Sequence, residues 1–283
     1  MSSCHTYKNA TLRLDESIRK ELASEKGVFG VAFKDLSTGR EIRINDKVEF
    51  HAASTMKTPV MVEVYRQAAE KKISLSDRVT LKNEFTSIAD GTKFTLDSAD
   101  DSETKLYRHL GEQRTISELL YQMITVSSNL ATNIIIEKVN PQNVMKTMRE
   151  MGAMDIRVRR GVEDNKAFAK GLNNTTTAHD LLLIFEQIAN GKAVNAESCA
   201  DMIRVLTDQQ FNEIIPAGVG PGVKVAHKTG SITGVQHDSG IVFMPDGRKY
   251  VLVILSKGLQ DEKSAVKSMA RVSEMIYDYM KDH

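Results

Sequence analysis

Residues 52–64 read AASTMKTPVMVEV, and this stretch contains Ser54 and Lys57 just ahead of an apolar run. The pattern predicts a helix that begins near Ser54, because Pro59 is tolerated only close to a helix start. Residues three apart share a helix face, so the Lys57 amine can reach the Ser54 hydroxyl. The first turn also faces the positive end of the helix dipole, which favours the neutral amine and makes Lys57 a usable base. Taken alone, the pair reads more readily as a helix-capping serine with an exposed lysine.

The same Ser-X-X-Lys spacing occurs three more times, in places that lack this context. These matches are Ser17 with Lys20, Ser102 with Lys105, and Ser264 with Lys267. We expect them on solvated helix faces or in a polar loop, without a catalytic role.

Two further motifs follow in the chain, Ser127-Ser128-Asn129 and Lys228-Thr229-Gly230. The first comes after a predicted helix, and caps of a helix-helix turn are its ordinary interpretation. The second ends the predicted strand Val223 to Lys228, where a strand edge with a turn glycine is the ordinary interpretation. All three motifs would seldom occur together, in this order and in these contexts, by chance.

Strands are predicted at both ends of the chain and helices between them. Near the start, an amphipathic helix over 11–25 precedes a hairpin formed by 28–33 and 41–44. Near the end, strands at 223–228, 240–244 and 250–256 precede a helix over 262–281. The pattern predicts an α+β fold: one mainly antiparallel sheet built from both termini, flanked by helices, with an all-α domain inserted.

The inserted domain is expected over residues 51–189, and the sheet domain over 1–50 and 190–283. A capping box from Thr115 to Glu118 precedes one helix of the insert, and Thr177 to Asp180 resembles another. The chain has 283 residues, which suits one large domain or two closely packed ones.

Composition excludes several classes of protein. The 38 Lys and Arg residues balance 37 Asp and Glu residues, which gives a net charge of +1. This composition does not predict the extended positive surface that binds nucleic acid. The longest apolar runs, such as 250–255, are too short to span a bilayer. Cys4 and Cys199 are far apart and the seven histidines show no metal-ligand spacing, so we expect neither a metal nor another cofactor.

The N-terminal residues lack the apolar core of a signal peptide. The chain is therefore either cytoplasmic or one from which a signal has been removed. Cys4 after Ser2 and Ser3 could mark a lipoprotein cleavage site, although a disordered tail with an incidental cysteine is the simpler interpretation.

The three motifs resemble those of class A serine β-lactamases or close relatives among the penicillin-recognising enzymes. The similarity extends from the strand at Val28 to the closing helix, and includes Ser127 to Asn133 and the Thr-rich run after Asn174. It implies an enzyme that hydrolyses the β-lactam amide and confers resistance. It also implies a monomer that acts in the periplasm or outside the cell, which favours removal of a signal.

The resemblance assigns catalytic roles residue by residue. Ser54 would attack the lactam carbonyl, and Lys57 would help to remove its proton. The backbone N–H groups of Ser54 and Ser231 would form the oxyanion hole. Ser127 would pass a proton to the leaving nitrogen, and Lys228 would keep the local potential positive.

Substrate-binding roles also follow from the resemblance. Asn129 would bind the side-chain amide of the substrate, while Thr229 and Ser231 would bind its carboxylate. The arginine that the family uses for this carboxylate is absent, and His237 with Asp238 stands in that area, so His237 is our candidate there.

Three further departures from the family pattern are visible. Ser128 stands where the middle motif usually has aspartate, from which we expect altered packing with retained chemistry. Glu163 is the candidate base for deacylation, but Lys166 and Ala167 occupy the usual Leu and Asn positions nearby. The segment 83–114 is longer and more acidic than expected, and part of it is predicted to be an added loop near the site entrance.

Three other functions stay open at this point. A D-alanyl-D-alanine carboxypeptidase or small esterase could use the same scaffold, with Glu163 as a solvated loop acid. A β-lactam-binding sensor would become acylated without turnover, and a non-catalytic relative would keep only the fold. The intact Ser54, Lys57, Ser127 and Lys228 argue against the non-catalytic version.

Overall fold

A five-stranded antiparallel sheet forms the centre of the fold in a computed structural model that describes residues 2–283, with side chains from residue 10 onward. The strand order is β2-β1-β11-β10-β9. The strands are β1 (Val28–Asp35), β2 (Glu41–Ile44), β9 (Lys224–Ile232), β10 (Val235–Phe243) and β11 (Lys249–Lys257). Strands from both ends of the chain share this sheet, which confirms the predicted α+β class.

The first and last strands of the chain are direct neighbours, because Val28 of β1 pairs with Lys257 of β11. Successive residues of a strand point to opposite faces, so each strand serves two cores. In β11, Val251 and Val253 contribute to one buried cluster, and Leu252 and Ile254 contribute to the other. The near-continuous apolar sequence of this strand follows from burial on both faces.

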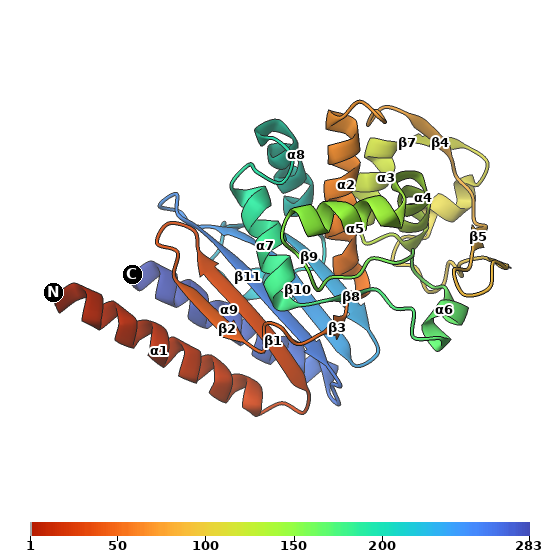
Figure 1. Ribbon diagram of the computed structural model, residues 1–283. Coiled ribbons are helices and arrows are strands. Elements are labelled where there is room, and N and C mark those ends of the chain that lie inside the picture. Colours follow the sequence, from red (N-terminus) through yellow and green to blue (C-terminus); the bar gives the residue numbers. More distant parts are fainter. Residues whose placement is uncertain (1) are drawn as a thin grey trace.

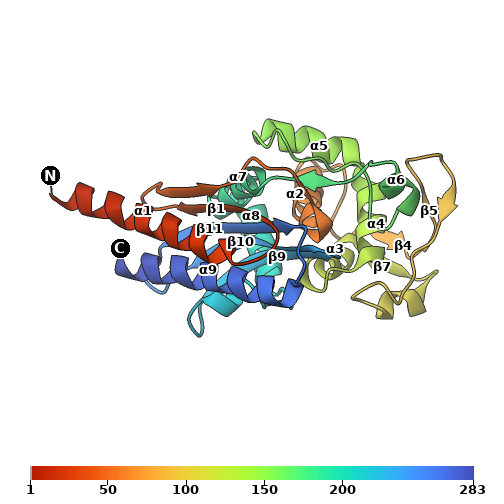
Figure 2. The ribbon, with the colours of Figure 1, turned by 90° about the horizontal axis from the view of Figure 1, so that it is seen from below.

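Two helices cover one face of the sheet, α1 (Ser2–Ala23) and α9 (Glu262–Asp282), and they pack against each other. Figure 2 shows the pair side by side beneath the strands. Helix α1 begins well before residue 11, where the sequence predicted its start, so the backbone over 2–7 is helical and the disordered tail predicted there was wrong. The Cys4 side chain, a possible lipidation site, lies outside the described side chains.

The remaining helices lie on the other face of the sheet and beside it (Figure 1). They are α2 (Lys57–Ala69), α3 (Ile116–Thr125), α4 (Asn129–Val139), α5 (Pro141–Glu150), α6 (Asn165–Ala169), α7 (Ala178–Ala189) and α8 (Ala196–Thr207). The predicted capping box is present, since Thr115 and Glu118 exchange side-chain bonds with each other's backbone at the start of α3. Thr177 likewise caps α7 by accepting from the Asp180 N–H.

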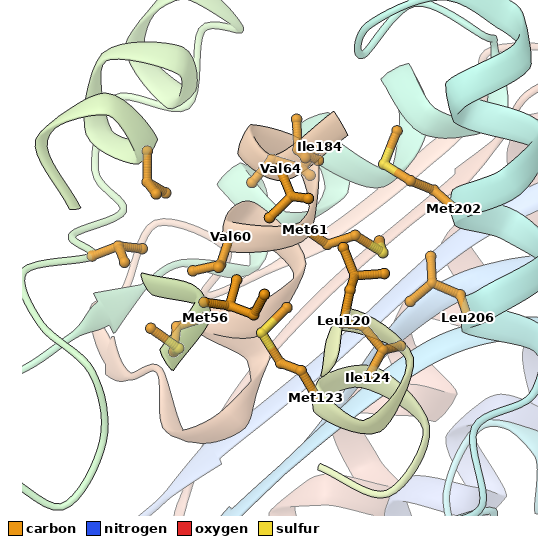
Figure 3. Packing of buried hydrophobic residues seen from close by; sticks show 14 of the residues in the cluster. Met56, Val60, Met61, Val64, Leu120, Met123, Ile124, Ile184, Met202 and Leu206 are labelled. Atoms are coloured by element: carbon orange, nitrogen blue, oxygen red, sulfur yellow. The ribbon is translucent and has the colours of Figure 1, made fainter. Parts of the chain in front are cut away.

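Helix α2 runs through the middle of this helical part with side chains buried on every side. Figure 3 shows Val60, Met61 and Val64 of its N-terminal half, with Met56 just before it, packed among neighbours from three other helices. Those neighbours are Leu120, Met123, Ile124, Ile184, Met202 and Leu206. A helix that is buried on all sides is held rigidly by its surroundings, so a residue at its N-terminus is fixed in position.

The prediction that residues 51–189 are all α was wrong in detail. Three short antiparallel pairs lie within this part of the chain, too brief to show any alternation of polar and apolar residues. They are β3 (Phe50–His51) with β8 (Thr175–Thr176), β4 (Arg78–Thr80) with β7 (Gln113–Thr115), and β5 (Phe85–Thr86) with β6 (Lys93–Phe94). Helix α7 packs on β1, β10 and β11, so the domain boundary at residue 189 stays a prediction.

No helix among residues 2–283 is both long and apolar enough to cross a membrane.

Candidate active site

Ser54 lies in a tight turn between β3 and α2. The turn is the 3-10 helix η1 (Ala53–Met56), and α2 continues from it at Lys57, close to the predicted helix start. Ala53 has a φ of +44°, a left-handed conformation that costs free energy in a non-glycine residue. The packing around α2 maintains this conformation and presents Ser54, which is only partly buried, to a cleft.

The cleft has a volume of about 440 Å³ and runs between the helical part and the edge strand β9. Its lining brings together candidates from all three sequence motifs: Ser54, Ser127, Asn129, Thr229, Gly230 and Ser231. A second hollow of about 360 Å³ continues past Ser54 to Glu163. Ser102 is exposed in a polar loop, as expected, and this loop also lines the first cleft, whereas Ser17 lies exposed on α1.

Lys57 is fully buried, and its ammonium donates three hydrogen bonds. The acceptors are the Ser127 carbonyl oxygen at 2.7 Å, Ser127 Oγ at 3.0 Å and Asn129 Oδ1 at 3.0 Å. Among the described side chains no bond joins it to the Ser54 hydroxyl. Burial lowers the pKa of Lys57 to about 7, although the negative charges of Asp101 and Glu163 act to raise this pKa. Desolvation by burial is therefore the main cause that makes this amine a base.

Lys228 is the second fully buried lysine, and it meets the first at the Ser127 hydroxyl. Its ammonium donates to Ser127 Oγ at 3.1 Å and to the Thr229 carbonyl at 3.0 Å. Burial and the neighbouring Lys57 charge lower the pKa of Lys228 well below its usual range. Ser127 itself has a φ of +57°, so its backbone is strained where it receives both amines.

Gly230 lies inside β9, whereas the sequence placed it after the end of a strand. A Cβ at this position would lie 3.1 Å from the backbone nitrogens of both Ser54 and Thr55. A side chain here would crowd the Ser54 turn, so glycine favours the close approach of β9 to it. Because β9 is an edge strand, one row of its backbone groups faces away from β10, on the side where Ser54 stands.

Glu163 comes from the loop before α6 and reaches the same centre. Asn129 Nδ2 donates to Glu163 Oε1 at 2.5 Å, while Asn129 Oδ1 accepts from Lys57. Glu163 has a φ of +60°, a third strained backbone beside the cleft. Burial raises its pKa and the Asp101 and Asp100 charges add to the rise, while the Asn129 bond and the Lys57 charge oppose it.

The loop that carries Glu163 is anchored by its neighbour, Asp164. This carboxylate is buried, accepts from Ser87 Oγ and the Ile88 N–H, and caps α6 through the Ala167 N–H. Asp164 therefore has its oxygens engaged within the protein, while Glu163 faces the cleft.

Residues 13–280 match the sequence model of the beta-lactamase enzyme family. The chain belongs to this family.

Similar proteins agree with the match. Beta-lactamase L2 of Stenotrophomonas maltophilia is 27% identical over 73% of this chain, and the match spans just 65% of that relative's own length. A beta-lactamase structure from Sphaerobacter thermophilus is 26% identical with a TM-score of 0.81, covering 94% of this chain and 97% of that one. A further similar structure is that of a PBP-A mutant with leucine replaced by glutamate, solved as an acyl-enzyme complex with penicillin G. It is 26% identical with a TM-score of 0.81, covering 96% of this chain and 97% of that one.

In this beta-lactamase family member, His237 does not have the free ring nitrogens that substrate binding requires. Its Nε2 lies 2.8 Å from the His51 carbonyl, and its Nδ1 lies 2.9 Å from the Gln236 carbonyl and 3.1 Å from the donating Ser256 N–H. Burial also lowers its pKa to about 4, which keeps the ring neutral. We therefore do not propose His237 as a carboxylate ligand. The sequence could not show that backbone groups of the protein would engage both of its ring nitrogens.

Gln236 is the polar cleft residue that the sequence reasoning missed. Its Nε2 donates to Ser231 Oγ at 2.9 Å and to Glu262 Oε2 at 2.8 Å. Strand alternation places residue 236 on the side opposite 237, and this alternation was the available signal.

The structure also explains how the family member accommodates Ser128. Ser128 Oγ accepts from the Ala131 N–H and so caps α4, as the helix-turn interpretation predicted. The backbone N–H groups of Asn129 and Leu130 are bound instead by Asp101, from the long acidic segment. No group of three His, Cys, Asp or Glu side chains that could hold a metal occurs among residues 10–283.

Proposed function

We propose that the protein is a serine β-lactamase of the class A type that works through an acyl-enzyme on Ser54. One observation carries the proposal: two buried lysines meet at the Ser127 hydroxyl in a cleft that also exposes Ser54. Burying two cations is costly, and such an arrangement is typical of a site that moves protons rather than of a packed core.

The acylation step follows from these contacts. Ser54 Oγ forms a bond to the lactam carbonyl carbon and gives its proton to the neutral Lys57 amine. The backbone N–H groups of Ser54 and Ser231 stabilise the oxyanion. When the carbon–nitrogen bond breaks, the nitrogen takes the Ser127 hydroxyl proton, which Lys57 or Lys228 replaces across 3.0 or 3.1 Å.

Substrate binding is assigned to polar groups along the edge strand and at α4. Thr229 and Ser231 offer hydroxyl donors for a carboxylate, and Gln236, whose amide N–H groups already bond to Ser231 and Glu262, holds the Ser231 hydroxyl in place. Asn129 Oδ1 already accepts from Lys57 and keeps a second lone pair for a substrate amide N–H.

Deacylation needs a base for the attacking water, and we assign that role to Glu163. Its raised pKa makes the carboxylate a stronger base than an exposed glutamate, and Asn129 orients one of its oxygens. Asp164, the other acid of the loop, has its oxygens engaged in hydrogen bonds within the protein. Lys166 and Ala167 replace the residues that usually hold the water, so we expect slow turnover.

The decisive experiment mixes the protein with a chromogenic cephalosporin and follows colour and intact mass together. A β-lactamase gives continuing colour with no lasting adduct. A lasting adduct with a single burst of colour indicates a sensor that acylates and stops. No reaction with the cephalosporin, together with release of D-alanine from a D-alanyl-D-alanine peptide, indicates the carboxypeptidase.

We expect Glu163→Gln to acylate but to keep the acyl group. The glutamine retains an acceptor for Asn129 yet cannot take a proton from water. Intact mass after mixing with a good substrate should show a persistent adduct. Glu213→Gln, the same change on an exposed residue lining the cleft, should turn over like the parent. Normal turnover by Glu163→Gln would make Glu163 a loop charge and point to another base.

The acylation rate should rise as the pH increases through about 7. Only the neutral Lys57 amine can take the Ser54 proton, and its pKa is lowered to about 7 by burial. Below that value the neutral fraction falls about tenfold per pH unit, so acylation should fall in proportion. Stopped-flow acylation across this range tests it, and a rate independent of pH would exclude Lys57 as the base.

We also propose that the protein acts as a monomer in the periplasm or outside the cell, where its substrates are found. Size-exclusion chromatography with light scattering and fractionation of the native organism test these two points, and a dimer or a cytoplasmic pool would contradict them.

A further inference from the structure

Asp101 is a buried carboxylate from the long segment between β6 and the 3-10 helix η2 (Lys105–His109). Only 6% of its surface is exposed, although the segment around it is largely polar. Its oxygens accept from the Asn129 N–H at 3.0 and 2.9 Å and from the Leu130 N–H at 2.9 Å. A side chain remote in sequence thus binds the backbone at the first residues of α4.

Two more donors complete the surroundings of this carboxylate. The Tyr107 hydroxyl donates to Oδ2 at 2.9 Å, and the Glu103 N–H donates to Oδ1 at 3.1 Å. A buried carboxylate is tolerated only when such donors satisfy it. Tyr107 and Glu103 belong to the same segment, so Asp101 is fixed from one side by its own segment and from the other by α4.

The N–H groups that Asp101 binds would otherwise be unsatisfied. The first N–H groups of a helix have no partner within the helix, and its positive dipole end attracts a carboxylate. In α4, the side-chain oxygen of the cap Ser128 accepts from the Ala131 N–H alone, which leaves the Asn129 and Leu130 N–H groups to Asp101. Residue 128 has no carboxylate, but the Asp101 carboxylate from another part of the chain lies at the start of α4 and binds its backbone there.

We propose that Asp101 is a positioning residue that fixes the Ser127–Asn129 turn and so sets the places of the Lys57 amine and the Glu163 carboxylate. The link is direct, because Ser127 accepts from Lys57, and Asn129 bonds to both Lys57 and Glu163. The role of Asp101 in turnover rests on the proposed function, but its hold on the α4 backbone does not.

The charge of Asp101 acts on the same two groups. It raises the pKa of Lys57 against burial, and it raises the pKa of Glu163 together with burial and Asp100. Lys57 also faces the Glu163 charge and lies close enough to Lys228 to lower the pKa of that second lysine. Removing the negative charge at residue 101 should therefore let both Lys57 and Glu163 lose their protons at lower pH.

The test compares Asp101→Asn with Asp97→Asn, the same change at an exposed position of the segment. The Asp97 carboxylate accepts only from the nearby Ala99 N–H. We expect the plateau acylation rate of Asp101→Asn to fall about tenfold or more, as misplaced catalytic groups typically cause. The rising limb of its pH profile should move to lower pH. Asp97→Asn should keep the parent's rate and profile. A purely structural Asp101 would lower thermal stability without moving the limb, and that result would overturn the proposal.

A milder variant guards against a failure to fold. Tyr107→Phe removes one donor and leaves the charge in place, so its plateau rate should fall less and its limb should stay close to the parent's. If Asp101→Asn is insoluble and the plateau acylation rate of Tyr107→Phe equals that of the parent, the inference is overturned.

A measurement that needs no substrate separates this inference from the proposed function. Hydrogen–deuterium exchange of a peptide spanning 126–132 should be faster in Asp101→Asn than in the parent and in Asp97→Asn, because an amide nitrogen replaces one acceptor. If the parent fails to react with any β-lactam, the proposed function is wrong, yet this exchange difference still tests the hold on α4. Unchanged exchange would overturn the inference even in an active enzyme.

Discussion

Ser54→Ala should lose the covalent adduct completely. Intact mass of the parent after incubation with a slow β-lactam is expected to rise by the mass of the ligand, and that of the variant should not change. The Ser54 hydroxyl stands at the strained turn that the backbone of β9 approaches closely, where the proposed oxyanion hole would receive the carbonyl oxygen. Since alanine fits a partly buried turn, the variant should fold like the parent.

Ser102→Ala is the matched control, because Ser102 lines the same cleft and shares the Ser-X-X-Lys spacing. Its hydroxyl donates to the Val126 carbonyl, and nothing in its surroundings removes its proton. We expect full labelling of this variant. Labelling of Ser17, Ser102 or Ser264 in place of Ser54 would refute the assignment.

Lys228→Ala should lose acylation by a factor of about a hundred or more, as removal of a positioned charge or proton donor typically does. The unfolding temperature, by contrast, should stay close to that of the parent. Truncation leaves a small cavity, but it also removes one of two cations buried around a single hydroxyl, and these two effects oppose each other. Single-turnover kinetics and thermal unfolding measure the two outcomes separately.

Lys224→Ala supplies the control on the same strand, because Lys224 is exposed and lies over the Phe243 ring at the far end of β9. We expect its acylation rate to match the parent's. If Lys228→Ala instead melts early while it keeps its activity, Lys228 is an ordinary strand residue and the site needs another source of positive charge.

The sequence predicted those parts of the molecule that depend on local patterns. Apolar periodicity located the sheet strands at both ends, and the capping box marked the start of α3. Motif spacing also placed Ser54, Lys57, Ser127 and Lys228 in one group, and the structure brings these four together. Their catalytic roles stay predictions until the variants are measured.

The first half of β10 was missed because its residues are polar and buried. His237, Asp238 and Ser239 have no exposed surface, and they bond to His51, His227 and Lys228 within the fold. A run of polar residues predicts a turn when the buried groups that hydrogen-bond to it are not known. The same reasoning placed Gly230 in a turn, although β9 continues past it.

Asp101 was out of reach for a different reason. Its partners on α4 follow it by nearly thirty positions, and no pattern in the sequence connects a carboxylate in a polar loop with the backbone N–H groups of a distant helix. The acidic composition of the segment 83–114 was the one visible sign that it carried more than a surface loop.

The pairing of β1 with β11 also constrains how the molecule folds. Val28 cannot find Lys257 until almost the entire chain has emerged from the ribosome, so the sheet closes late and with a large loss of chain entropy. The helical part, with its many local contacts, can collapse earlier. Lys228 is on the edge strand and reaches Ser127 only when β9, β10 and β11 have assembled, so catalytic competence should be the last property that a refolding molecule regains. Until then, unpaired strands stay exposed, and slow refolding should compete with aggregation.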